Sequence, residues 1–301
     1  MNETITIIQP NKLRRVDELV TERQFNDLMD TSLTSLRSIP LIMPETNWDA
    51  LRETGITIEA LNLSSLGEEE RIQTLKDMAL TYKSVFAGEP WREVSRCEKT
   101  GKFFPEQPGG LCSCCGIITI DAYPVEETMQ YISDELSRPN ATCMIMRGRD
   151  NKIVGGAWGY SYKNPQEFVE DKYPEDMQSE ILAALKSVEI NGEFFYMSES
   201  FILPQQDEQG NSLYRGKGVL NAFYQMFVNS AQNLGLPMVG RTTADSLQVN
   251  KALSNFGFEL FFGLKVISER RQIRIIKNTY VNGIDRQNER RVLYALGGSN
   301  T

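Results

Sequence analysis

The chain has 301 residues, 41% of them hydrophobic and 24% charged, which suits one large domain or two smaller ones with their own core. It carries 40 acidic against 32 basic residues, and this net charge of −8 argues against nucleic-acid binding through bulk charge and favours a cationic partner. The sequence contains no histidine, so catalytic histidine pairs and histidine metal ligands are excluded. Proton transfer is left to carboxylates, tyrosine, cysteine, lysine or water.

The N-terminal segment, MNETITIIQP, lacks the basic and apolar regions of a secretory signal. No run in the sequence approaches the ~18 apolar residues of a transmembrane helix. Five cysteines, an odd number, favour free thiols in a reducing compartment over a disulfide framework. We therefore expect a cytoplasmic protein that does not bind membranes.

Residues 1–54 form an N-terminal extension, which we interpret as a packing appendage or the contact of a homodimer. Apolar and polar residues then alternate over 56–63, which predicts a strand there. A capping box at Ser65 and Glu68 predicts the start of a helix that ends at Gly88. A cysteine-bearing loop, 88–121, leads to a helix that begins near Pro124. Later elements are strands at 142–147, 152–160, 194–203, 238–242, 258–276 and 291–296, and helices at 219–234 and 246–255. This alternation predicts a mixed α/β sheet protein.

Residues 163–193 are rich in acidic side chains and look like an insertion. Part of this segment, 174–188, fits a helix whose apolar residues face inward. The carboxylates are either a solvated helix face or a surface that attracts polyamines, aminoglycosides or lysine-rich termini.

The segment Y-R-G-K-G-V at 214–219 precedes the predicted helix 219–234. Glycines allow consecutive N–H groups to point at one spot, and the helix dipole adds positive potential there, so the turn could hold a pyrophosphate. A tight connection before a helix would use the same residues. The spacing fits neither a Walker A loop nor the dinucleotide fingerprint.

The element order, together with Arg215 and Gly218, resembles the GCN5-related N-acetyltransferase (GNAT) family over about residues 55–297. The resemblance implies a GNAT-like α/β fold, with a mixed, mostly antiparallel sheet flanked by helices and a splayed central strand, in a domain at 55–301. It also implies acetyl-CoA as the cosubstrate. In the family signature [RQ]-x-x-G-x-[GA], Arg215 and Gly218 take the first and fourth places, and Leu220 takes the sixth.

The same resemblance implies which residues bind the cofactor. Main-chain amides of the turn would bind the pyrophosphate, through Arg215, Gly216, Lys217, Gly218, Val219 and Leu220. The end of strand 194–203 would pair with the pantetheine arm, through Phe201, Ile202 and Leu203, and a main-chain amide near Leu203 would polarise the thioester carbonyl.

Glu199 is the predicted general base, because the family often places a glutamate in this strand. Met197 and Phe201 on the same strand face would bury it partly and raise its pKa toward a useful range. Alternatively, Glu199 satisfies a backbone group or a lysine. For the general acid, Leu253 stands where the family has a tyrosine, so Tyr224 and water are the remaining options.

The cysteine-bearing loop contains Cys97, Cys112, Cys114 and Cys115. The C-x2-C spacing of Cys112 and Cys115 suits tetrahedral zinc, with Cys97 as a third ligand and Cys114 or Glu98 as the fourth. The alternatives are free thiols or a redox-labile disulfide. Cys143 is expected in the core. A metal here would be structural, since the resemblance implies that catalysis needs none.

These observations predict an acetyl-CoA-dependent N-acetyltransferase that acts on a small-molecule or peptide amine, preferably a cationic one. The alternative is a non-enzymatic module of the same fold that senses acyl-CoA or binds proteins.

Overall fold

The computed structural model describes most of the chain from residue 55 onward. The described residues are Ile5–Thr6, Leu19–Val20, Leu51, 55–88, 91–173, 175–205, 212–215, 218–243, 259–262, 265–267, 272–274, 278–280, 284–286 and 291–296. Gly216, Lys217, Leu253 and the expected helix at 246–255 lie outside them, as does most of the N-terminal extension. Leu51 belongs to the same buried core cluster of the main sheet as Ile56.

A sheet of seven strands forms the centre of the molecule, in the order β11-β16-β10-β9-β8-β7-β3. Its members are β3 Thr57–Leu61, β7 Thr142–Arg147, β8 Ile153–Tyr162, β9 Phe194–Ile202, β10 Met238–Thr243, β11 Glu259–Phe262 and β16 Arg291–Leu296. Within the described ranges, β9 and β10 are parallel neighbours and the other pairings of this sheet are antiparallel. The remaining strands lie in small sheets: β1 Ile5–Thr6, β2 Leu19–Val20, β4 Ser95–Arg96, β5 Phe103–Phe104, β6 Ile120–Asp121, β12 Lys265–Ile267, β13 Gln272–Arg274, β14 Asn278–Tyr280 and β15 Ile284–Arg286.

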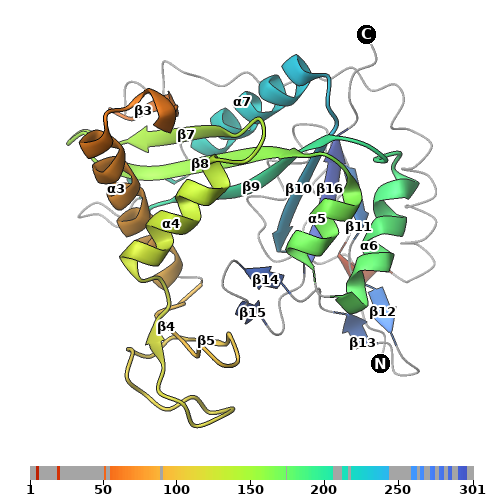
Figure 1. Cartoon of the computed structure of the whole chain (residues 1–301), viewed down its shortest axis with the longest axis horizontal. Helices are drawn as coiled ribbons and strands as arrows, with labels where there is room; N and C mark the ends of the chain where they lie inside the picture. The colour runs from red at the N-terminus through yellow and green to blue at the C-terminus, as the bar shows by residue number, and fades with distance from the viewer. Residues whose placement is uncertain are drawn as a thin grey trace.

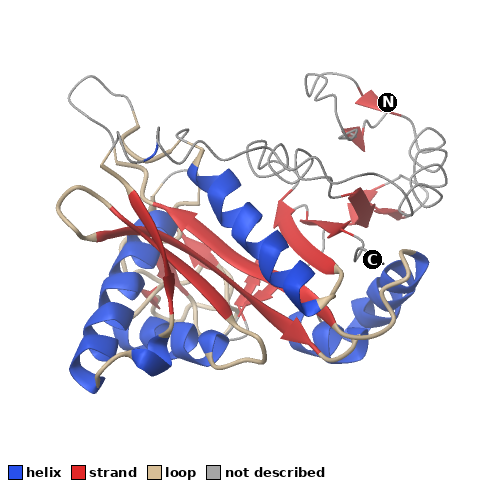
Figure 2. Ribbon diagram, turned by 90° about the horizontal axis from the view of Figure 1, so that it is seen from above, coloured by secondary structure: helices blue, strands red, loops and turns tan. Residues whose placement is uncertain are grey.

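Helices cover both faces of the large sheet (Figures 1 and 2). They are α3 Glu68–Ala87, α4 Val125–Leu136, α5 Pro165–Lys172, α6 Glu175–Ser187 and α7 Val219–Leu234, with a short 3-10 helix at Leu63–Ser65. Helix α7 buries Phe223 and Phe227 against one face. Helices α3 to α6 share the core of the other face, which contains Tyr82 and Trp158. The predicted mixed, mostly antiparallel sheet flanked by helices is therefore confirmed.

Local signals placed most helices correctly but misjudged some of their details. The predicted capping box at Ser65 is wrong, because Gly67 is the N-cap of α3 and the Ser65 hydroxyl donates to the carbonyl of Asn62. Helix α5 was missed. It begins with Asn164, whose side chain accepts from the Glu167 N–H, followed by Pro165 at the first helical position.

The segment between α3 and α4 folds as a small excursion (Figure 1). Strands β5, β4 and β6 form a three-stranded antiparallel sheet in that order. Two ion pairs hold the base of this excursion against the helices, Lys83 with Asp121 and Arg96 with Glu127. None of the helices described here is long and apolar enough to cross a membrane.

Candidate active site at the open strand

The central strand β9 separates from β10 halfway along its length. The two strands pair only over Phe195–Met197 and Met238–Gly240 in the part of the chain that the structure describes. Beyond this point β10 pairs with β16, whereas β9 continues to Ile202 with β8 as its neighbour. The two strands diverge in Figure 1. The predicted splayed central strand is therefore present, and among the described residues no strand pairs with the edge of its second half that faces β10, which we call the open edge.

A β-bulge in β9 changes which side chains share a face. Trp158 is opposite Glu199 and the next residue of β8, Gly159, is opposite Met197, so Ser198 is the extra residue. Met197 packs on the α7 side of the sheet, whereas Phe201 packs with Trp158 on the other side. The prediction that Met197 and Phe201 flank Glu199 on one face is therefore wrong.

The backbone of β9 directs alternate amides to its two edges. The Leu203 N–H donates to the carbonyl of Val154 in β8 at 2.8 Å, so the amide near Leu203 that is expected at the thioester would have to be a neighbouring one. Alternation then turns the N–H groups of Ser200 and Ile202 toward the open edge. In agreement, the carbonyl of Ile202 accepts from the Arg215 Nε at 3.1 Å, from the side away from β8.

The turn before α7 contains two of the predicted cofactor residues, Arg215 and Gly218, and Arg215 contacts this edge. Arg215 is half-buried, and its main-chain N–H donates to Ser212 Oγ at 2.8 Å. Burial lowers the pKa of the Arg215 guanidinium, which nevertheless stays charged at neutral pH. Gly218 is the N-cap of α7 with φ 83°, and a Cβ on this residue would meet no atom within 4 Å. Val219 is buried and Leu220 is half-buried in the core beneath the turn.

Glu199 lies on the face of β9 that α4 covers. The Tyr131 hydroxyl on α4 is 3.4 Å from the Glu199 Oε1 and donates to it. Burial, together with the charges of Glu135 and Glu199, raises the pKa of Tyr131 well above its usual value. Tyr131 therefore stays protonated and directs its proton to the Glu199 carboxylate. The half-buried Glu199 stands beside the open half of β9.

A second glutamate, Glu135 of α4, is buried directly behind this region, and the sequence analysis does not single it out. Its carboxylate accepts from four groups: Ser198 Oγ at 2.5 Å, Tyr160 Oη at 3.0 Å, Trp158 Nε1 at 3.3 Å and Lys172 Nζ at 3.3 Å. Its position one turn after Tyr131, on the buried side of α4, is a signal that could have identified it. Through Ser198, Glu135 holds the bulge in place.

The hydroxyl of Tyr224 reaches the open strand from α7. It is buried and forms a hydrogen bond with the side chain of Ser200. Burial raises the pKa of Tyr224, and the bond with Ser200 offsets part of this rise. The protonated hydroxyl of Tyr224 therefore lies next to Ser200, whose N–H points to the open edge of β9.

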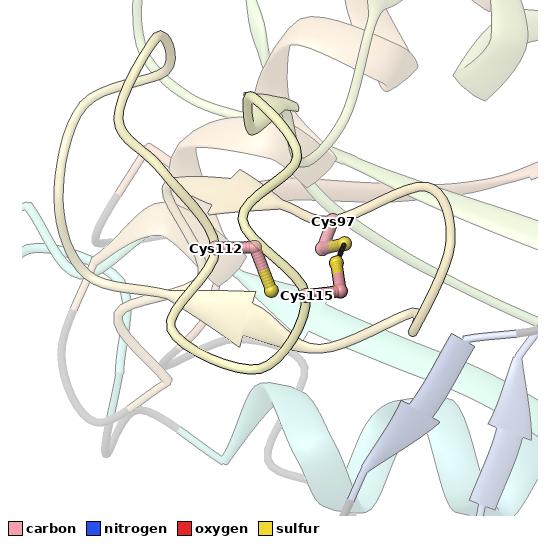
Figure 3. Close-up of side chains that lie close together, drawn as sticks. All are labelled: Cys97, Cys112 and Cys115. Atoms are coloured by element: carbon pink, nitrogen blue, oxygen red, sulfur yellow. Dashed lines mark hydrogen bonds between the residues drawn. The ribbon is translucent and has the colours of Figure 1, made fainter.

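Three of the four predicted metal-ligating cysteines converge at the excursion (Figure 3). The sulfur atoms of Cys97, Cys112 and Cys115 all lie within 4.8 Å of one another, and Cys97 Sγ is 3.4 Å from Cys115 Sγ. Cys114 is exposed and is not part of the cluster, and Glu98 is exposed as well.

The thiols of this cluster have opposite tendencies to ionise. Burial raises the pKa of Cys112, but hydrogen bonds from the Cys114 N–H, the Cys97 thiol and the Cys115 backbone outweigh it and lower the pKa to about 6. For Cys115, the hydrogen bond with the Ile117 backbone lowers the pKa, but burial and the neighbouring Cys97 and Cys112 outweigh it and raise the pKa. Away from the cluster, Cys143 is buried in the core as predicted, and burial raises its pKa.

The sequence matches no protein-family profile and no curated protein. Solved structures with a similar fold include arylalkylamine N-acetyltransferase 2 from Aedes aegypti, with 11% identity, a TM-score of 0.42, and coverage of 80% of this chain and 97% of that one. An N-acetyltransferase from Staphylococcus aureus Mu50 has 11% identity, a TM-score of 0.41, and coverage of 80% and 98%. A protein assigned as an acetyltransferase from Salmonella typhimurium, solved with its cofactor acetyl-CoA, has 8% identity, a TM-score of 0.40, and coverage of 82% and 95%.

At these identities and TM-scores, the likenesses assign no activity to this chain. The sheet order, the parallel pair β9–β10 and the splayed, bulged strand are observed directly in its own backbone. The described chain thus has the GNAT-type architecture that the sequence resemblance predicts.

Proposed function

We propose that the chain transfers an acetyl group from acetyl-CoA to an amine. The observation that carries this proposal is the open edge of β9 between Ser198 and Ile202. The amide-containing pantetheine arm can pair with such an edge as an added strand would, because the N–H groups of Ser200 and Ile202 point outward. The arm would bring the thioester to the bulge beside Glu199.

The turn before α7 supports the placement of the pyrophosphate. Gly218 has a left-handed backbone, and the space that its Cβ would occupy is open, so phosphate oxygens could approach the first N–H groups of the helix. No acidic side chain lies in the first turn of α7 to oppose an anion. Arg215 links this turn to the end of β9 and adds a positive charge.

Glu199 would act as the general base. The acceptor nitrogen attacks the thioester carbonyl carbon and gives up a proton to Glu199, directly or through water. The edge amides of Ser200 or Ile202 would stabilise the oxyanion of the tetrahedral intermediate. The C–S bond then breaks, and the thiolate of coenzyme A takes a proton from Tyr224 or water.

We further propose that the acceptor is cationic and that the protein acts in the cytoplasm. The net charge of −8 favours cationic ligands, and the carboxylate of Glu199 would attract an ammonium group. None of the five cysteines forms a disulfide in the structure, which suits a reducing compartment. Dimer formation through residues 1–54 stays a prediction.

A pair of matched variants tests the cofactor site by calorimetry with coenzyme A. Gly218 and Gly235 are at opposite ends of α7, both have positive φ, and both face open space. Gly218→Leu and Gly235→Leu should therefore lose similar stability, but only Gly218→Leu should weaken coenzyme A binding, by at least about tenfold. Equal affinities of the two folded variants would contradict the site.

Thiol release from acetyl-CoA, together with detection of the acetylated product, tests turnover. Cationic amines should react faster than neutral amines of the same size. If coenzyme A binds but no amine in the panel is acetylated, the chain is a non-enzymatic acyl-CoA-binding module and the proposed activity is wrong.

A further inference from the structure

The excursion between α3 and α4 contains two turns with the same hydrogen-bond pattern. In the first turn, the Cys97 N–H donates to the Lys102 carbonyl at 2.9 Å, and the Cys97 carbonyl accepts from the Gly101 N–H at 2.7 Å. In the second turn, the Cys112 N–H donates to Ile117 and its carbonyl accepts from Gly116, both at 2.8 Å. The hydrogen bonds therefore align the sequence of the first turn, C-E-K-T-G-K at 97–102, with that of the second, C-S-C-C-G-I at 112–117.

The glycines of the two turns have the backbone that this geometry requires. Gly101 has φ 66° and Gly116 has φ 70°, both in the left-handed region that a side chain disfavours. A cysteine that starts a tight turn, followed by a glycine four residues later, recurs here 15 positions further along the chain. Paired turns with C-x2-C spacing are the usual way in which a structural zinc ion is held.

The three sulfur atoms have the spacing that one metal ion requires. With Zn–S bonds of ~2.3 Å in a tetrahedral site, neighbouring sulfurs are ~3.8 Å apart. The sulfurs of Cys97, Cys112 and Cys115 lie within 4.8 Å of one another, and the Cys97–Cys115 pair is at 3.4 Å. Cys97 and Cys112 are buried, and Cys115 is half-buried, so the cluster is largely screened from water.

Thr100 occupies the place in the first turn that Cys115 occupies in the second. Its Oγ1 is 3.8 Å from the Cys112 Sγ, on the same cluster. Cys114 is instead in the middle of the second turn. Its sulfur is exposed and 3.8 Å from Lys102 Nζ, while its main-chain N–H donates to the Cys112 Sγ at 3.4 Å.

The structure assigns a zinc centre to these two turns, with Cys97, Cys112 and Cys115 as thiolate ligands. The fourth coordination position of the zinc lies next to the side chain of Thr100. Zinc binding requires all three groups as thiolates, so any thiol proton still present is released to solvent, and the oxidation state is unchanged. Water or the Thr100 hydroxyl completes the tetrahedron, and Cys114 is not a ligand. The assignment depends on the cysteine geometry alone and is independent of acetyl transfer.

Metal analysis of the full chain, purified under reducing conditions without chelator, tests the assignment. We expect about one zinc ion per chain in the wild type and in Cys114→Ser, and a loss of zinc in Cys97→Ser and Cys115→Ser. Cys114→Ser is the matched control, because it removes a thiol from the same loop. Metal-free wild-type protein, or equal loss of zinc in Cys114→Ser, would overturn the assignment.

A gain-of-ligand variant keeps the test valid if the serine variants do not fold. Thr100→Cys should complete a four-thiolate site, so it should retain zinc at chelator concentrations that strip the wild type. In the cobalt-substituted chain, the sulfur-to-cobalt charge-transfer absorbance should rise by about one-third, from three thiolates to four. If Thr100→Cys changes neither retention nor absorbance, Thr100 is not at the fourth position. The zinc assignment would also be overturned if the purified protein were metal-free, contained a Cys97–Cys115 disulfide and bound no cobalt after reduction. In that case the two cysteines would be a redox pair.

Discussion

Glu199 faces α4 because of one extra residue in β9. In a regular strand Glu199 would share a face with Met197, which packs toward α7. The bulge at Ser198 shifts the alternation, and Glu199 comes to lie against Tyr131 instead. The face on which Glu199 lies cannot be inferred from a period-two pattern, since the pattern itself gives no sign of the extra residue.

The first prediction concerns the base. Glu199→Gln keeps the shape of the side chain and its bond with Tyr131 but removes its basicity, so kcat should fall by roughly 10²–10⁴-fold. Coenzyme A affinity should stay unchanged, because the turn at Gly218 is intact. The loss should shrink at high pH, where more of the acceptor amine is already neutral. Steady-state kinetics with a reactive amine from the panel measure both effects.

Glu193→Gln is the control for this experiment. Glu193 is an exposed glutamate just before β9, and its Oε1 accepts from Asn140 Nδ2 at 3.3 Å. It should retain wild-type kcat. If Glu199→Gln turns over as fast as Glu193→Gln near neutral pH, Glu199 is not the base.

At the level of elements, the divergence of β9 and β10 gives the site its open edge. Gly159 of β8 makes the bulge of β9 sterically possible, because a Cβ there would be 2.6 Å from the Tyr196 carbonyl oxygen and 2.7 Å from the Phe195 ring. Beyond the bulge, β8 pairs with β9 as far as Gly155 opposite Ile202. One edge of β9 is thus paired with β8, while beyond Met197 the other edge pairs with no strand in the described part of the chain.

Hydrogen exchange can test this edge at residue resolution. The Ser200 and Ile202 amides should exchange rapidly in the free protein and become protected when coenzyme A is added, because the pantetheine arm would pair with them. The Leu203 amide already donates to Val154, so its protection should change little and it serves as the internal control. Saturating coenzyme A that leaves Ser200 and Ile202 unchanged would show that the cofactor does not pair with β9.

The sequence predicted the elements well where a local pattern determines them. Helices α4 and α7 and strands β7 and β16 begin or end within a residue of their expected limits, because turns, prolines and glycines mark them. The buried face of a helix is harder to predict: Ile72 of α3 and Leu234 of α7 are apolar, yet their side chains are 48% and 43% exposed. Which side of a helix is covered depends on neighbours that are distant in sequence.

For the whole molecule, the splayed sheet was predicted only through the family resemblance. No local signal shows that β10 pairs with β9 over three residues and then with β16 alone. The cysteine cluster was predicted from spacing, but the role of Thr100 was not, since a threonine in a loop carries no metal signal by itself. The charged network behind the site was also missed, because its members come from four separate elements.

That network connects the acidic insertion to the sheet. Asp171 on α5 accepts from the Tyr162 hydroxyl of β8 and pairs with Arg138 Nη2 at 2.9 Å and with Lys172 Nζ at 3.4 Å. Lys172 and Arg138 in turn contact Glu135, at 3.3 and 3.4 Å. At least one of the acidic residues at 163–193 therefore has a structural role, so not all of them are available to attract a substrate.

The pH dependence of stability tests this connection. Burial alone would raise the pKa of Asp171, but the charge of Lys172, the Tyr162 hydroxyl and the charge of Arg138 outweigh it and hold the pKa below its usual value. The carboxylate of Asp171 therefore binds a proton more tightly in the unfolded chain than in the folded one. The ionised Asp171 stabilises the fold at pH values above the pKa of an unfolded aspartate. This stabilisation is lost as the pH falls through the lower pKa that Asp171 has in the folded protein. Asp171→Asn should thus lower the free energy of unfolding at pH 7 by about 1–3 kcal/mol. The difference from wild type should shrink in the range below about pH 4.

Urea unfolding of both chains, from pH 7 down to the lowest pH at which they fold, measures this difference. Glu170→Gln is the matched control, since Glu170 is on the same helix but is exposed. Among the contacts described, its only hydrogen bond is the one that its Oε1 accepts from Gln166 Nε2 at 2.6 Å. Its effect should be within about 0.5 kcal/mol at every pH, as for other exposed pairs. A cost of Asp171→Asn that is the same at pH 7 and in acid would mean that the shape of the side chain, and not its charge, ties α5 to α4 and the sheet.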